Sequence, residues 1–202
     1  MAAAAIRQRV PFRYSEDGEQ EGHVLNEQEQ EEVIERLRQE SAGSNAAYLV
    51  GLQAVIGLSF LLHLLYIARS PHHSPLAVLF PDAQTGRPLP LSTVLALLQL
   101  AIHCNLGLNV LSPDHPIRQA IQTSNLPPSF RPPIPLSHPA SLIAPAVAPL
   151  YALLLGQGWV EVLWWSITGI LSGIVGVSLK WIQEEEAQIK ELERLRYNAR
   201  GA

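Results

Sequence analysis

The chain has 202 residues, of which 48% are hydrophobic and 16% are charged, and its formal net charge is −4. This length allows one domain or one compact membrane bundle, and the acidic balance leaves no basic surface of the kind that binds nucleic acid. A single cysteine, Cys104, excludes an internal disulfide and any CxxC metal or redox site. Because apolar residues flank it, we expect Cys104 to be a small buried side chain.

Charged residues are strongly segregated along the chain. Only seven lie over 46–179, and the other 25 occupy the two ends. Solvated ends around an apolar block predict an all-α, polytopic membrane protein. It divides into an acidic, mostly disordered cytosolic tail over 1–45, a four-helix transmembrane domain over 46–182, and a charged cytosolic helix and tail over 183–202.

The N-terminal tail is expected to hold one short helix. Its first 14 residues carry three arginines and no acid, which faintly resembles a mitochondrial presequence. No secretory signal peptide is expected, because the first long apolar stretch begins only at residue 46. Asn26 and Glu29 form a capping-box pattern that predicts a helix over about 27–40, which Gly43 should end.

Four apolar stretches are predicted to cross the membrane, over 46–68, 90–111, 140–155 and 159–182. The third is the shortest and contains Pro145 and Pro149, so we expect a kinked helix packed against its neighbours, with a re-entrant segment as the alternative. The fourth measures roughly 36 Å and passes without a break signal into charged sequence. One helix should therefore continue beyond the bilayer.

The loop over 112–139 holds eight of the sixteen prolines. Such a segment is expected to be an extended, polyproline-like connector, with a docking site for an aromatic-lined groove as the lesser alternative. Four spans place both termini on one side. If that side is the cytosol, it carries twelve of the fourteen Lys and Arg residues, which is the bias that orients membrane helices.

Ionisable and amide side chains inside the predicted spans are the first candidates for a functional site. They are His63, His103, Asn105, Asn109 and Glu161. His63 and Glu161 differ in depth by only about 4 to 5 Å, so a hydrogen-bonded pair is one hypothesis and a carboxylate that reaches lumenal water is the other. The second span, which also carries Gln99, has a polar face suited to interhelical hydrogen bonds.

Small residues form a second candidate feature, a helix-packing face. Ser166, Gly169, Gly173 and Gly176 recur at helical spacing in the fourth span, and Gly51 lies on a similar face of the first. Such faces let backbones approach closely. The neighbour is either another span of this chain, which we favour, or another protein.

Beyond the last span, apolar residues form one edge of the charged helix, and a weak apolar stripe marks the predicted N-terminal helix. The two sets are expected to pack together or to contact a partner, although the edge covers barely two heptads of a coiled coil. The edge comprises Ile182, Ile189, Leu192 and Leu195, and the stripe comprises Val33, Ile34 and Leu37.

The sequence contains none of the common catalytic motifs, and only three acids occur over 46–182. His72, His73 and Asp82 are weak evidence for a metal, so we expect no metal, no cofactor and no enzymatic activity.

These patterns favour a non-catalytic subunit, assembly factor or scaffold of an internal membrane, most simply the endoplasmic reticulum, with the mitochondrial inner membrane as the alternative. Its partners would be membrane lipid and other membrane proteins. The competing hypothesis is a small transporter or lipid-handling protein that uses His63, His103 and Glu161.

Overall fold

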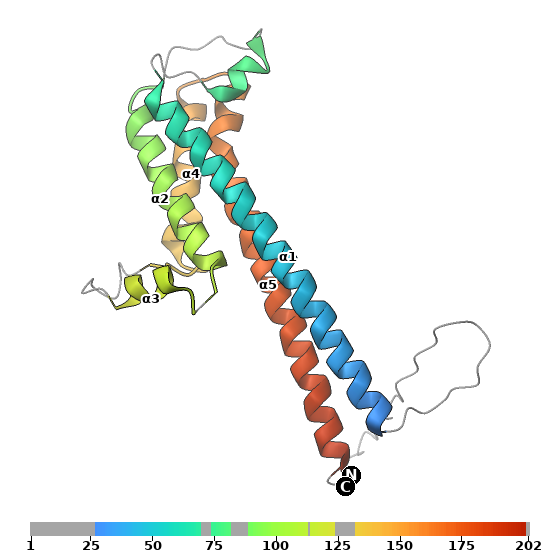
Figure 1. Ribbon diagram of the computed structural model, residues 1–202. Helices are drawn as coiled ribbons and strands as arrows, with labels where there is room; N and C mark the ends of the chain where they lie inside the picture. Colours follow the sequence, from blue (N-terminus) through green and yellow to red (C-terminus); the bar gives the residue numbers. More distant parts are fainter. Residues whose placement is uncertain (1–26, 70–73, 82–88, 113, 124–131, 201–202) are drawn as a thin grey trace, which may run out of the picture. The chain divides into compact units, whose positions relative to one another are not determined.

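The computed structural model describes residues 27–69, 74–81, 89–112, 114–123 and 132–200, and every regular element in these ranges is helical. Figure 1 shows the helices in chain order. The four longest are α1 (Glu27–Ala68), α2 (Ser92–Val110), α4 (Pro139–Leu154) and α5 (Trp159–Arg200); the two short ones are η1 (Pro75–Val78) and α3 (Pro116–Gln122).

Helices α1, α2 and α5 are long and apolar enough to cross a membrane, and α4 is a shorter apolar helix of 16 residues. Helix α4 continues through Pro145 and Pro149. It ends in a turn where Gly156 has a φ of 64°, a left-handed conformation that glycine adopts without steric cost. The prediction of an all-α fold with the helices of a polytopic membrane protein is confirmed.

Three predicted boundaries are wrong. Gly43 does not end a short helix, because α1 runs without interruption through it, and a single glycine costs only about 1 kcal/mol in a helix. Helix α2 begins at Ser92, so Pro90 lies before its first turn. The proline-rich loop is not extended throughout: α3 forms where the His115 side chain caps the helix and Pro116 occupies its first turn.

The chain forms two compact units, one comprising residues 1–43 and 185–202 and the other residues 44–184. We call them the charged unit and the bundle unit. In the charged unit, the described parts of α1 and α5 run in opposite directions, side by side (Figure 1), and Arg38 Nη1 lies 3.5 Å from Glu193 Oε1. The expected packing between the two apolar stripes is supported, since Val33, Ile34, Ile189 and Leu192 are half-buried.

The bundle unit has two apolar core layers. One is built around Tyr66, Trp164 and Trp165 with small residues of α2 and α4, and the other around Leu52, Leu106 and Val175. Helices α1, α2 and α5 contribute to both layers.

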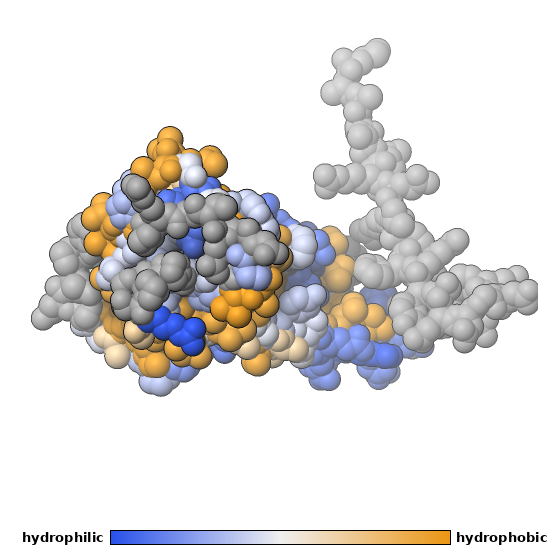
Figure 2. Space-filling view, turned by 90° about the horizontal axis from the view of Figure 1, so that it is seen from above, coloured by the Kyte–Doolittle hydropathy of each residue, from blue (hydrophilic) through white to orange (hydrophobic). Residues whose placement is uncertain are grey.

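The outer surface of the bundle unit is also strongly apolar. Figure 2 shows hydrophobic side chains, in orange, reaching the surface in several places. Large exposed apolar side chains recur along α1, α4 and α5; they include Val55, Leu58, Leu61, Leu142, Leu150, Leu153, Ile170 and Ile174. Water-soluble proteins rarely expose so much contiguous apolar surface, whereas a lipid environment accommodates it.

Candidate functional site

A layer of buried polar side chains lies between the two apolar layers of the bundle unit. Ser59 and His63 come from α1, Gln99 and His103 from α2, and Thr168 from α5, and all five are buried. Each lies about one turn from a residue of the apolar layers on its own helix, which explains how three helices bring polar groups to one level. We call these five residues the polar layer.

The two histidines of this layer share Ser59 as a partner. His103 Nδ1 lies 2.6 Å from the Gln99 carbonyl oxygen and must donate to it, so Nε2 accepts a hydrogen bond from the Ser59 hydroxyl at 2.7 Å. His63 Nδ1 likewise donates to the Ser59 carbonyl oxygen at 2.9 Å. Both carbonyl contacts fix the tautomer of the neutral imidazole, in which Nδ1 carries the proton and Nε2 the lone pair.

Aromatic rings hold the imidazoles in place. The His63 ring stacks on Trp164, with centroids 4.6 Å apart and planes inclined by 21°, and its centroid lies 5.0 Å from that of His103. Tyr66 contacts Trp164 and Trp165 at 5.9 and 5.5 Å. The aromatic end of α5 therefore forms the wall against which the polar layer packs.

Several buried polar atoms around this layer have no hydrogen-bond partner among the described residues: His63 Nε2, Gln99 Oε1, Thr168 Oγ1 and the indole nitrogens of Trp164 and Trp165. They comprise acceptors, a hydroxyl and two N–H donors. Each unsatisfied group costs about 1 to 3 kcal/mol when buried, and ordered water commonly satisfies such groups. The layer offers hydrogen bonding, and among the described residues it places the Ser59 hydroxyl on His103 Nε2.

The predicted hydrogen-bonded pair of His63 and Glu161 is not formed. His63 uses Nδ1 on its own helix and its Nε2 has no partner, whereas Glu161 Oε1 accepts from the backbone N–H of Ser74 at 3.3 Å. Equal depth along two helices does not fix the direction in which a side chain points. No hydrogen bond thus joins His63 to Glu161, which the transporter hypothesis groups with the two histidines.

Asn105 and Asn109 bind the segment before α4 and do not join the polar layer. The Asn105 amide accepts from the Ile134 backbone N–H at 2.7 Å and donates to the Ile134 carbonyl oxygen at 3.1 Å. Asn109 donates to the same carbonyl at 3.1 Å. These bonds satisfy the backbone of Ile134, which lies between two prolines and has no regular helix or sheet to join.

The predicted small-residue face of α5 lies against α4. A Cβ atom placed on Gly169 would be 3.7 Å from Pro145 Cβ, and one on Gly176 would be 3.9 Å from Leu136 Cδ1. Gly173 has no heavy atom within 4 Å of such a position, and neither has Gly51. Close packing within the chain is therefore present at Gly169 and Gly176, while Gly173 and Gly51 face open space.

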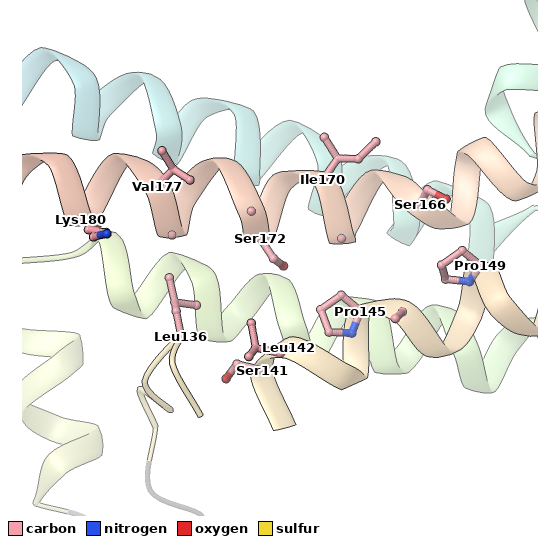
Figure 3. A pocket seen from close by; sticks show the side chains of 14 residues that line it. Leu136, Ser141, Leu142, Pro145, Pro149, Ser166, Ile170, Ser172, Val177 and Lys180 are labelled. Atoms are coloured by element: carbon pink, nitrogen blue, oxygen red, sulfur yellow. The ribbon is translucent and has the colours of Figure 1, made fainter. Parts of the chain in front are cut away.

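An open apolar cavity of about 600 Å³ lies along this face. Ser166, Gly173 and Lys180 of α5 line it, together with Pro145 and Pro149 of α4, as Figure 3 shows. Sequence analysis identified the glycines but not the cavity, because the contribution of α4 depends on which faces the two helices present to each other.

The remaining candidates add no chemistry to the site. Cys104 is exposed, so the expectation that it is buried is wrong: it points away from the helix neighbours that bury His103 beside it. His72, His73 and Asp82 lie outside the described residues. Within the described ranges, no three His, Cys, Asp or Glu side chains gather as metal ligands would.

No protein-family model, curated protein or solved structure matches this chain.

Proposed function

We propose that the protein is a non-catalytic, multi-pass subunit, assembly factor or scaffold of an internal membrane, most simply the endoplasmic reticulum. The observation that carries this proposal is the charged unit, a pair of antiparallel helical segments from the first and last long helices. Such a pair presents a surface to other proteins without supplying any catalytic group.

The composition of the charged unit supports a role in binding. Three ion pairs of its described residues, Arg36 with Glu40, Arg38 with Glu193 and Arg194 with Glu191, are exposed and contribute little to stability. Leu37 and Leu195 remain 41% and 56% exposed. Two short apolar edges that only half-bury each other favour a third amphipathic helix, and we propose that a partner subunit supplies it in a short coiled coil.

The pairing also supports an arrangement in which both ends of the chain lie on one side of the membrane. The contact between Arg38 and Glu193 is what an even number of crossings would produce. Three helices are long enough to span, and we propose that α4 adds a fourth crossing. The basic residues outside the short loops favour the cytosol for that side.

The test is purification of the tagged protein at native expression level in gentle detergent, with quantitative mass spectrometry of co-purifying proteins. Leu37→Glu places a charge on the apolar edge, and Gln188→Glu places the same charge at an exposed polar position of the charged unit and serves as the matched control. Circular dichroism of the purified variants checks that both remain helical.

A stoichiometric membrane partner that wild type and Gln188→Glu retain and Leu37→Glu loses supports the proposal. Recovery of the wild type without any stoichiometric protein would contradict it. That result would favour the transporter or lipid-handling alternative, which has less support because His63 Nε2 has no hydrogen-bond partner among the described residues and so does not bind Glu161.

A further inference from the structure

The cavity between α4 and α5 has a volume of about 600 Å³ and a mostly apolar lining that follows α5 from Ser166 to Lys180. A Cβ atom added to Gly169 would be in ordinary contact with Pro145, and one added to Gly176 with Leu136, whereas Gly173 borders open space. The open depth at Gly173 therefore suits a single hydrocarbon chain.

The cavity is somewhat longer than the hydrocarbon part of one bilayer leaflet. Figure 3 places Ser166 and Pro149 at one end and Lys180 at the other. From Ser166 to Lys180, α5 rises roughly 21 Å, whereas one leaflet contributes about half of a 30 Å hydrocarbon core. An acyl chain in the cavity would thus bring its glycerol and headgroup to the level of Lys180.

Two opposite charges follow each other along α5 at the Lys180 end of the cavity. Lys180 is followed one turn later by Glu184, with Nζ and Oε1 3.5 Å apart and the two side chains 74% and 54% exposed. Helical spacing places both on the same face of α5 as Gly173 and Gly176. A ligand that rises out of the cavity meets first a cation and then an anion.

This order matches the headgroup of a zwitterionic phospholipid, in which the phosphate adjoins the glycerol and the ammonium lies beyond it. An anionic headgroup such as that of phosphatidylglycerol would bring the same phosphate to Lys180 but no cation to Glu184. We propose that the cavity binds one acyl chain of a zwitterionic glycerophospholipid, with Lys180 on the phosphate and Glu184 beside the ammonium. This site is independent of the charged unit that the proposed function uses.

The proposal is tested by native mass spectrometry of protein released from nanodiscs that contain equal amounts of phosphatidylcholine and phosphatidylglycerol with identical acyl chains. Wild type should retain one phosphatidylcholine in preference to phosphatidylglycerol. Glu184→Gln should reduce this preference about fivefold, and Lys180→Gln should reduce retention of both lipids about fivefold, since a charge at the membrane surface has roughly that effect. Both positions are exposed, so the fold should persist.

Two glycine variants locate the acyl chain. Gly173→Leu fills open space and should abolish retention, whereas Gly51→Leu adds the same side chain at an open position of α1 and should leave it unchanged.

Equal retention of the two lipids by wild type, or preferential retention of phosphatidylglycerol, overturns the assignment. Unchanged lipid retention in Gly173→Leu also overturns it. A change of oligomeric state in Gly173→Leu, with no change in bound lipid, would show that a second copy of the chain covers the cavity instead.

Discussion

Ser59 connects the two buried histidines, since its carbonyl oxygen accepts from His63 and its hydroxyl donates to His103. A hydrogen bond adds only about 1 kcal/mol of net stability. Removing a hydroxyl from a buried bond costs more than that, because the partner is left buried without a hydrogen bond. Ser59 is thus the residue on which the polar layer depends most.

Ser59→Ala should lower the free energy of unfolding in detergent by about 1 to 3 kcal/mol, because His103 Nε2 loses its donor. Ser172→Ala is the matched control, since the Ser172 hydroxyl donates only to the Thr168 carbonyl of its own helix. Unfolding curves in a denaturing detergent measure both variants. Equal stability of the two variants would contradict the role given to Ser59.

Asn105→Leu should speed hydrogen exchange at the Ile134 amide about tenfold, because it removes the acceptor of that N–H. Ile134 has the only backbone N–H within 132–135, so a peptide over this range reports on it alone. Asn109→Leu leaves this acceptor in place and should change the rate little. Similar acceleration in both variants would mean that the segment moves as a whole.

For single residues, the sequence predicted which buried side chains are polar but not which groups they form hydrogen bonds with. His63 and His103 stood out because ionisable groups are rare in apolar helices. Ser59 and Thr168 carried no such signal, since Ser and Thr are ordinary in membrane helices. The hypothesis of a hydrogen bond between His63 and Glu161 failed for a related reason, while the alternative that Glu161 reaches lumenal water stays open: helical rise predicts depth, whereas the direction of a side chain depends on how the helices pack.

At the scale of the helix, the glycines of α5 have two different roles. Gly169 and Gly173 belong to one GxxxG pattern and both line the cavity, but a Cβ atom added to Gly169 would contact Pro145, whereas one added to Gly173 would meet no atom within 4 Å. The pattern predicted the face correctly, but the position of α4 along that face determines which glycine is in contact.

Gly169→Leu should lower the free energy of unfolding by about 1 to 3 kcal/mol, because the larger side chain meets the Pro145 ring and backbone. Gly173→Leu should stay within about 0.5 kcal/mol of wild type, since its added atoms enter open space. The same detergent unfolding assay applies. The reverse order of the two variants would show that the helices pack differently.

The length of the apolar stretches also explains which helices were predicted correctly. The spans were predictable because continuous apolar runs must form helices in lipid. The end at Gly43 was wrong because flanking helix-forming residues outweigh one glycine. Helix α3 was missed within the proline-rich loop, although Pro116 directly after a capping residue is a recognised start signal.

For the whole molecule, the proposed topology places both ends of the chain on one side of the membrane. The contact between Arg38 and Glu193 supports this proposal, because it joins residues of the first and last long helices. Helix α4 spans about 24 Å, less than a typical hydrocarbon core, and would cross by local thinning of the bilayer. Composition alone favoured this topology, and the pairing within the charged unit adds an independent argument.

The most direct test is thiol labelling in a Cys104→Ser background, with single cysteines at residues 20, 85, 125 and 202. An impermeant reagent is applied to cells in which only the plasma membrane has been opened. Residues 20, 125 and 202 should react, and residue 85 should react only after full permeabilisation. Protection of residue 202 together with residue 85 would mean three crossings, and would contradict both the spanning role of α4 and the cytosolic charged unit.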